Sequence, residues 1–262
     1  MRHAAVAIVL FAACAQITAP LELGPLDGSL EAAVVRQEKW VLSESDGSVS
    51  VLTPRSVRNE VARAWLRVVR EERMRVAAWL KLPMVGKLEL RVVDRFPDGF
   101  EADGFSSAKR VFVKGNPDAE PRSAERDLIG HELVHVFLAS QWKVTRPFWF
   151  EEGLATYIEG ESLGFGGTGT SLLAGTVGLE ALDSRKLMFA DLHSYPPRLG
   201  YRLAALAIDD FLVRHGKSKL LALGREAGDF EGAYAVVTGE TVSLLEERWR
   251  SAIRAEILRR SR

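Results

Sequence analysis

The stretch His131-Glu132-Leu133-Val134-His135 decides how the rest of the chain is interpreted. On an α-helix, residues four apart point about 40° apart around the axis and lie one turn apart along it. Two imidazoles on one helical face can therefore reach a single metal ion. The Glu132 carboxylate leans toward the same side, where it can hold a water molecule. The pattern predicts a helix that carries two metal ligands and a general base.

A structural histidine pair on an otherwise apolar helix is the competing interpretation of this stretch. It is the weaker one, because burying two imidazoles and a carboxylate without partners costs free energy. A metal ion supplies the partner. Zinc in a hydrolytic site needs a third protein ligand and an open position for water. We therefore expect one zinc ion per chain, held by His131, His135 and an oxygen or nitrogen donor from a nearby element.

The segment 148–157, with sequence FWFEEGLATY, offers that third ligand. Sixteen residues separate His135 from Glu152, enough for a loop and the return of an antiparallel helix. Glu151 and Glu152 are adjacent, so on a helix they point about 100° apart and only one can face the metal. Gly153 and Ala155 are small, which would let this helix approach the helix of the histidines.

Composition is that of a soluble globular protein, with 47% hydrophobic and 27% charged residues. Lys plus Arg and Asp plus Glu both number 35, which gives a net charge of zero. Nucleic-acid binding would favour a clear basic excess, so we expect no nucleic-acid partner. Serine or cysteine catalysis has no support either, because the sequence has no Gly-x-Ser-x-Gly and its only cysteine lies near the N-terminus.

Residues 1–19 have the pattern of an export signal. Arg2 supplies a positive start, and residues 4–13 form an unbroken apolar run that is too short to span a membrane. Cys14 follows the run directly, in a setting that resembles a bacterial lipoprotein processing site, with Phe11 where leucine is usual. Either a lipid is attached to Cys14 or the signal is cleaved just beyond it. We expect an exported protein, periplasmic or in the cell envelope, and otherwise secreted.

The first half of the chain is expected to form a small β-layer with one long helix across it. Residues 34–42 and 49–53 are β-prone and flank an Asp-Gly turn, which predicts a hairpin. A helix is expected over 54–82, with Thr53 as its N-cap and Pro54 in its first turn. Strands are expected at 88–93 and 106–114.

The second half is expected to be almost entirely helical. Helices are predicted over 124–140, 148–158, 199–215, 220–228 and 242–258. Residues 160–178 are rich in glycine, serine and threonine and are expected to form a loop or lid. A phosphate loop is not expected there, because the segment lacks the lysine that such a loop requires.

The two metal motifs resemble those of gluzincin-type zinc metallopeptidases, in the peptidase MA-like superfamily that includes thermolysin and the zinc aminopeptidases. In that group the ligand is the glutamate directly before glycine in a Glu-Gly-[Leu/Phe]-Ala stretch, which here is Glu152, with Glu151 as the alternative. The resemblance implies that Glu132 takes the proton of the attacking water and later gives it to the leaving amine. It extends over about residues 85–255, although only the two motifs are specific.

The resemblance also implies a donor that stabilises the oxyanion of the reaction. Tyr201 matches the tyrosine of the zinc aminopeptidases, and His193, the alternative, matches the histidine of thermolysin. The strand at 106–113 would lie along the active-site cleft and pair with extended substrate backbone.

The chain departs from the family pattern in three places. The spacing from His135 to Glu152 is a little shorter than in thermolysin or the aminopeptidases. Thermolysin has an aspartate four residues after the ligand glutamate, where this chain has Thr156, so the partner that orients a ligand histidine is unassigned. A Gly-x-Met-Glu-Asn stretch, which binds a free N-terminus in the aminopeptidases, is lacking, and this favours an endopeptidase.

Together these observations predict an α+β, zincin-like fold with a small N-terminal β-sheet, a long packing helix and a mainly helical lobe. The expected domains are a signal at 1–19, an α/β lobe with the cleft edge strand at 20–118, and a helical zinc-binding catalytic lobe at 119–262. The expected function is an exported zinc metallopeptidase acting on a peptide or protein substrate. The alternative is a non-catalytic zinc-binding module of the cell envelope, which would not need Glu132. A purely structural zinc site is disfavoured, because such sites usually use cysteines.

Overall fold

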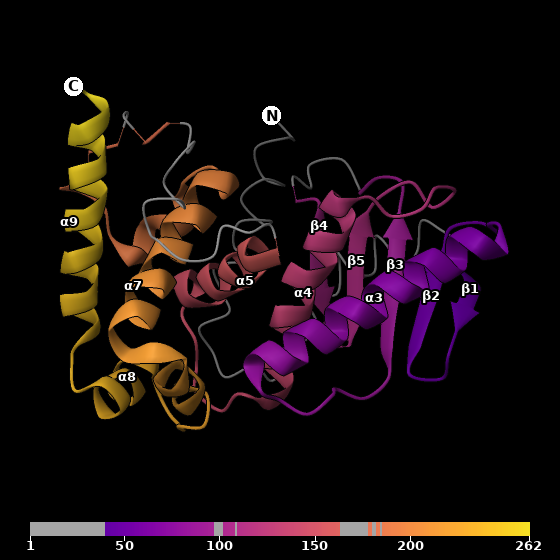
Figure 1. Cartoon of the computed structure of the whole chain (residues 1–262), viewed down its shortest axis with the longest axis horizontal. Coiled ribbons are helices and arrows are strands. Elements are labelled where there is room, and N and C mark those ends of the chain that lie inside the picture. Colours follow the sequence, from indigo (N-terminus) through magenta and orange to yellow (C-terminus); the bar gives the residue numbers. More distant parts are fainter. Residues whose placement is uncertain (1–39, 97–101, 108, 163–177, 180–181, 184) are drawn as a thin grey trace, which may run out of the picture. The chain divides into compact units, whose positions relative to one another are not determined.

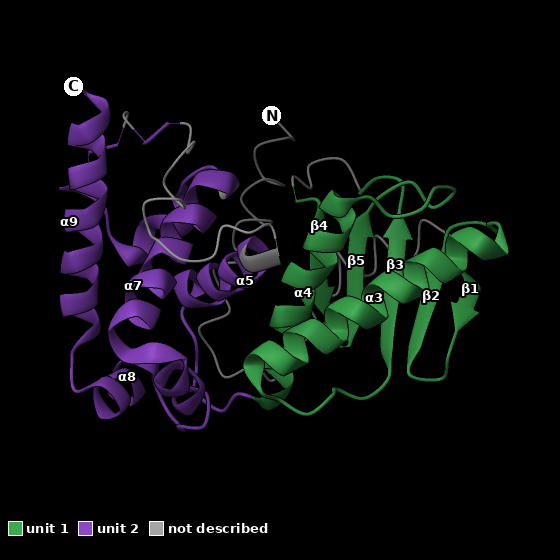
Figure 2. Cartoon of the chain, viewed as in Figure 1, with its two compact units in different colours: residues 1–16, 21–141 green, residues 17–20, 142–262 purple. Residues whose placement is uncertain are grey.

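The computed structural model describes residues 40–96, 102–107, 109–162, 178–179, 182–183 and 185–262. The described residues fall into two compact units, one ending at Gln141 and the other running from Trp142 to Arg262 (Figure 2). The predicted export signal with Cys14, and most of the predicted loop at 160–178, lie outside the described residues. None of the described helices has the length and apolar character that crossing a membrane requires. The domain boundaries expected from the sequence concern functional lobes and stay a prediction.

The first unit is built on a five-stranded mixed sheet in the order β1-β2-β3-β5-β4 (Figure 1). Its strands are β1 (Val41–Ser45), β2 (Val49–Thr53), β3 (Leu88–Val93), β4 (Gly104–Ser107) and β5 (Arg110–Lys114). β1 pairs with β2 and β4 with β5 in antiparallel fashion, while β2–β3 and β3–β5 are parallel. Among the described strands, β1 and β4 are therefore the edges, and β5 lies inside the sheet.

Two helices, α3 (Asn59–Leu80) and α4 (Ser123–Gln141), pack together and against the sheet. α3 lies against β1 and β2, and α4 against β4 and β5, as Figure 1 shows for α3 running across the strands. Leu88, Leu90 and Val92 alternate along β3 and are at most 1% exposed. Burying a side chain of this size contributes about 1.5–3 kcal/mol, and the period of two selects the strand conformation.

The second unit is helical and is organised around α7 (Pro197–Leu223). α5 (Phe148–Ser162), the 3-10 helix η2 (Phe189–Ser194), α8 (Phe230–Thr238) and α9 (Val242–Arg260) all pack against it. α7 bends at Gly216, whose φ of 76° lies in the left-handed region that glycine adopts without strain. Aromatic side chains fill the core: Trp149 stacks on Phe189 at 4.2 Å between ring centroids, and Phe189 lies 4.8 Å from Trp249.

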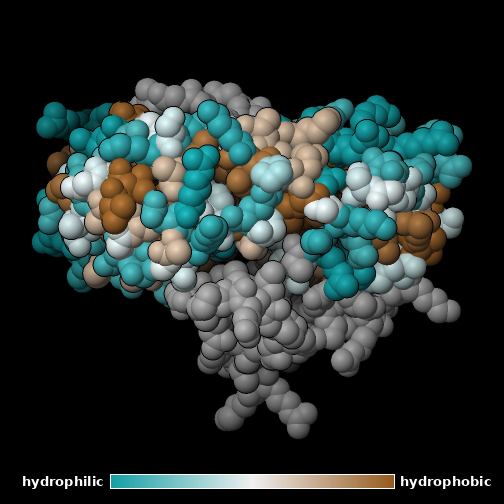
Figure 3. All heavy atoms as spheres, turned by 90° about the horizontal axis from the view of Figure 1, so that it is seen from below, coloured by the Kyte–Doolittle hydropathy of each residue, from teal (hydrophilic) through white to brown (hydrophobic). Residues whose placement is uncertain are grey.

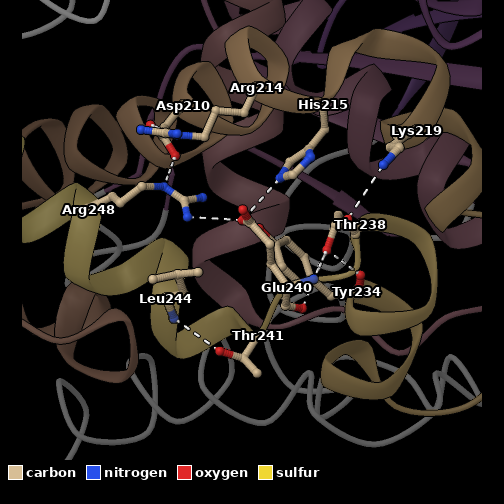
Figure 4. Close-up of polar contacts among 10 residues, drawn as sticks. All are labelled: Asp210, Arg214, His215, Lys219, Tyr234, Thr238, Glu240, Thr241, Leu244 and Arg248. Atoms are coloured by element: carbon tan, nitrogen blue, oxygen red, sulfur yellow. Dashed lines mark hydrogen bonds and ion pairs between the residues drawn. The ribbon is translucent and has the colours of Figure 1, made fainter.

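A polar network joins α7, α8 and α9 (Figure 4). Arg248 of α9 donates from Nε to Asp210 of α7 at 3.0 Å and pairs through Nη1 with Glu240 at 2.9 Å. His215 of α7 lies 3.3 Å from the same Glu240 oxygen. The turn between α8 and α9 is thereby tied to α7.

The described surface mixes polar and apolar residues. On the face in Figure 3, hydrophilic residues alternate with separate hydrophobic patches. The most exposed large apolar side chains, Leu42, Val213 and Val236, belong to three different elements. Isolated apolar residues of this kind are ordinary on soluble proteins.

The expected α+β fold, a small N-terminal sheet followed by a helical region, is confirmed, but several boundaries were wrong. α3 begins at Asn59 with Arg58 as its N-cap, not after Thr53. Thr53 ends β2, where its hydroxyl donates to the Arg55 carbonyl at 2.7 Å. The single strand expected at 106–114 is instead the antiparallel pair β4 and β5, in which Ser107 faces Arg110. The helix expected at 199–215 matches the first of two helical stretches of α7, which meet at a kink at Gly216. The second stretch ends at Leu223, not at residue 228, and α8 was not predicted.

Candidate metal centre

The centre begins with the two histidines in the middle of α4. Their Nε2 atoms lie 3.4 Å apart, and the rings meet edge to face. His131 and Glu132 are buried, and His135 is half-buried. Ile129, Leu133 and Phe137 of the same helix are 0% exposed. The apolar residues therefore fix the helix in the core while the two ring nitrogens converge.

α4 is held against α3 by a buried glutamate. Glu72 of α3, whose side chain is 2% exposed, accepts from Arg75 Nε at 2.6 Å and from Arg126 Nε at 2.7 Å. Gly130 directly precedes His131, and a Cβ there would lie 2.6 Å from Arg75 Nη2 and 3.0 Å from Glu72 Oε2. The glycine leaves the space that this ion pair needs, so the helix of the histidines is anchored one residue from its first candidate ligand.

A second ion pair lies at the start of α4. Arg122 donates from its backbone and from Nε to the carboxylate of Glu125. Burial pushes the pKa of the Glu125 carboxyl upward, but these hydrogen bonds outweigh it and hold the pKa below its usual range. The resulting negative charge in the first turn suits the positive end of the helix dipole.

Of the two adjacent glutamates on α5, Glu151 is already engaged. Arg146 donates from Nε to Glu151 Oε1 at 2.6 Å, and the two side chains are 6% and 10% exposed. A carboxylate held by a guanidinium inside the protein is a poor candidate for a metal ligand. The contact favours Glu152 over Glu151.

The three expected ligands come together. One ligand atom from each of His131, His135 and Glu152 lies within 4.8 Å of the others, and this group could hold a metal ion. In a tetrahedral zinc site with bonds of about 2.1 Å, two ligand atoms are about 3.4 Å apart. The separation of 3.4 Å between the histidine Nε2 atoms fits that geometry. Two imidazole nitrogens and a carboxylate oxygen form a donor set that zinc accepts in hydrolytic sites.

Both candidates for the oxyanion donor lie beside Phe148, the first residue of α5. The Phe148 ring is 6.1 Å from the ring of Tyr201 and 6.2 Å from that of His193. Phe148 precedes Glu152 by four residues and therefore shares its helical face. The structure thus places Tyr201 and His193 around one residue, and the choice between them stays a prediction.

Thr156 lies one turn beyond Glu152. Its hydroxyl oxygen is buried and has no hydrogen-bond partner within the described residues. The group that would orient a ligand histidine is therefore still unassigned.

The prediction that residues 106–113 form the strand along the cleft was wrong about which residues lie at the edge of the sheet. Because β5 is enclosed by β3 and β4, the edge on this side of the sheet, among the described strands, belongs to β4. α4 packs closely on it, since a Cβ at Gly104 would lie 2.9 Å from Leu128 Cδ1. The edge strand that could pair with an extended substrate is therefore residues 104–107, not 106–113.

Solved structures with a similar fold are known, although no family model and no curated protein sequence matches the chain. Native yeast LTA4 hydrolase superposes with a TM-score of 0.51 at 16% sequence identity, over 80% of this chain and 38% of the hydrolase chain. The fold resembles that of this hydrolase. The same yeast enzyme in complex with bestatin gives a TM-score of 0.49 at 19% identity, over 77% of this chain and 37% of the other.

This likeness concerns the fold. The chain spans less than two-fifths of the length of the hydrolase chain. The shared part has the small mixed sheet and the helical region that the sequence predicted, which agrees at the level of the fold with the gluzincin resemblance. Activity, metal and substrate have to be argued from the residues of this chain.

Sequence reasoning missed the side chains that hold the two helices in place. Arg146 and Glu151 are five residues apart on either side of Pro147, a spacing that no helical rule pairs. Glu72 and Arg126 are far apart in the sequence and meet only through the packing of α3 on α4. The glycine before His131 was a visible signal, because a glycine inside a helix usually has a packing reason.

Proposed function

We propose that the chain is a zinc-dependent metallopeptidase that hydrolyses peptide bonds. The observation that carries the proposal is the grouping of His131, His135 and Glu152 beside a buried Glu132. A site that only stored zinc would have no use for a carboxylate next to the first ligand. The fold likeness to a hydrolase supports the proposal at the level of the scaffold.

The reaction is divided among the residues of the chain. His131, His135 and Glu152 would hold the metal, which supplies Lewis acidity to the substrate carbonyl and to the attacking water. Glu132 accepts the proton of that water and later gives it to the leaving amine. Tyr201, with His193 as the alternative, donates a hydrogen bond to the carbonyl oxygen as negative charge develops on it.

We propose endopeptidase action and a place outside the cytoplasm. The lack of a stretch that binds a free N-terminus supports endopeptidase action, and the apolar run at 4–13 followed by Cys14 supports export, with a lipid on Cys14 as one form of attachment. The substrate is a peptide or protein segment that can adopt an extended conformation.

The test compares the wild type with Glu132→Gln on a peptide library that contains both free and acetylated N-termini. Glutamine keeps the size of the side chain but cannot accept the proton, so kcat should fall by at least about 100-fold. Zinc content by elemental analysis should stay near one per chain in both proteins. Cleavage of acetylated peptides would identify an endopeptidase.

Two results would contradict the proposal. Equal hydrolysis by the wild type and Glu132→Gln would remove Glu132 from the mechanism. A zinc-loaded protein that hydrolyses no peptide, while binding peptides or envelope components, would favour the non-catalytic binding module.

A further inference from the structure

The segment before α5 is fixed to the residues that directly follow α7. Lys143 donates its backbone N–H to the Gly224 carbonyl and Thr145 donates to the Gly228 carbonyl, both at 3.0 Å. Val144 forms a parallel bridge with Gly228. The backbone directly before Arg146 is therefore held in place by these hydrogen bonds.

Arg146 connects this anchored segment to the first turn of α5. Its Nη1 donates to the Val144 carbonyl at 3.0 Å, while its Nε donates to Glu151 Oε1 at 2.6 Å. The guanidinium and the carboxylate are both buried. Buried ion pairs add little net stability compared with apolar residues of the same size, but they can fix one arrangement among several.

Contacts on two nearly opposite sides of α5 hold the helix in place. Successive residues of a helix point about 100° apart, so Glu151 and Gly153 point about 160° apart and Glu152 points between them. Glu151 is held by Arg146, and a Cβ at Gly153 would lie only 2.7 Å from the Ala204 carbonyl oxygen of α7. With both sides fixed, the rotation of α5 about its axis is fixed, and with it the direction of Glu152.

We propose that Arg146 is a positioning residue, which holds Glu151 away from the metal and thereby presents Glu152 as the single carboxylate ligand. The inference rests on the proposed zinc site. Two adjacent glutamates would otherwise compete, since a rotation of α5 by about 100° exchanges one for the other. Arg146 prevents this competition because its guanidinium donates to the Val144 carbonyl and to the Glu151 carboxylate at the same time.

The experiment measures zinc affinity by competition with a chelator, and the visible spectrum of Co²⁺ bound in place of zinc, which reports ligand identity and geometry. The first variant is Arg146→Lys: lysine keeps the charge but cannot bridge both acceptors, so Glu151 is released to compete for the metal. It should bind zinc about 10- to 100-fold more weakly and change the Co²⁺ spectrum. The second variant is Arg146→Met combined with Glu151→Met, which should fold because apolar replacement of a buried ion pair is often tolerated. It has no competing carboxylate, so its zinc affinity and Co²⁺ spectrum should stay close to those of the wild type. Glu151→Gln, which keeps an acceptor oxygen for Arg146, should stay close to the wild type.

Arg248→Met is the matched control, because Arg248 is a half-buried arginine of the second unit that is also paired with carboxylates. It should lower stability and leave the zinc affinity and the Co²⁺ spectrum unchanged. If it changes the spectrum as much as Arg146→Lys does, general loosening explains the effect and the positioning role is wrong.

Wild-type affinity and spectrum in Arg146→Lys would also overturn the inference. A folded double variant that loses as much affinity as Arg146→Lys would contradict it too, because no carboxylate competes with Glu152 in that variant. If the wild-type protein binds neither zinc nor Co²⁺, the proposed zinc site itself is wrong. This measurement on the wild type separates failure of the zinc site from failure of the positioning role.

Discussion

Gly153 illustrates how a single residue sets the packing of α5. The sequence indicated that a small residue here allows close approach of another helix, and it predicted the helix of the histidines as the neighbour. The structure places the backbone of Ala204 and the side chain of Ile208 against Gly153, so the close neighbour is α7. The need for a small side chain was readable from the sequence, whereas its partner depended on tertiary packing.

We predict that Gly153→Ala destabilises the protein by about 2–3 kcal/mol, because the added Cβ meets rigid backbone and α5 has to move. Thermal or urea unfolding measures the change. Gly232→Ala in α8 is the control: Gly232 is exposed, and a Cβ there meets only the Asp229 side chain, at 3.3 Å. That variant should be neutral or slightly stabilising, since alanine favours the helix. Equal losses in the two variants would show that the contact with Ala204 does not constrain α5.

The residues of the metal group were predictable to different degrees. His131, Glu132 and His135 follow from helical periodicity, which needs no knowledge of tertiary structure. Glu152 could be separated from Glu151 only through the family resemblance, and the contact of Glu151 with Arg146 now supports the same choice. Tyr201 and His193 both lie by Phe148, so the structure narrows their location without deciding between them.

At the scale of elements, the helices were predicted more reliably than their ends. α4, α5 and α9 have nearly the expected bounds because their apolar positions recur at helical spacing. The start of α3 was wrong because Thr53 is used by the sheet: its hydroxyl bonds to Ser43 of the neighbouring strand. The break expected after His215 is confirmed, because Gly216 has non-helical backbone angles and two helical stretches of α7 meet there at a kink.

The contact of α8 with α9 gives a prediction about alkaline pH. Tyr234 of α8 is 0% exposed, and burial raises the pKa of its hydroxyl to about 12, with the nearby Arg248 guanidinium opposing the shift. An unfolded tyrosine titrates near pH 10. The unfolded state therefore loses the proton first, and the stabilisation is complete below about pH 10 and is lost as the pH rises toward 12.

We predict that the free energy of unfolding falls by about 1–2 kcal/mol between pH 10 and 12 because of Tyr234. Urea unfolding at several pH values, for the wild type and Tyr234→Phe, isolates this contribution from that of the other titrating groups. Tyr234→Phe should have the shallower alkaline slope and nearly unchanged stability at pH 7. Parallel pH profiles of the two proteins would contradict the assignment.

At the scale of the whole molecule, the class of fold was predictable and the sheet order was not. A β-rich first half and a helical second half follow from periodicity along the chain. The parallel pairing of β2 with β3 and of β3 with β5 joins strands separated by α3 and by β4, and no local pattern specifies it. The reversal between β4 and β5 was missed because both runs favour strands and the turn between them is short.

Metal binding should raise the stability of the folded protein, because the group of candidate ligands is assembled by the fold. A ligand that binds only the folded state stabilises it by mass action, by about 4 kcal/mol when its free concentration is 1,000 times its dissociation constant. We therefore expect a clear rise in melting temperature with excess zinc compared with a chelator. His131→Ala should abolish the rise because a ligand is lost, whereas Glu132→Gln should keep it because Glu132 is not a ligand. Differential scanning calorimetry of the three proteins measures the effect.

A melting temperature that is the same with zinc and with chelator would mean that the folded chain does not hold the metal. A shift that survives in His131→Ala would mean that zinc binds elsewhere.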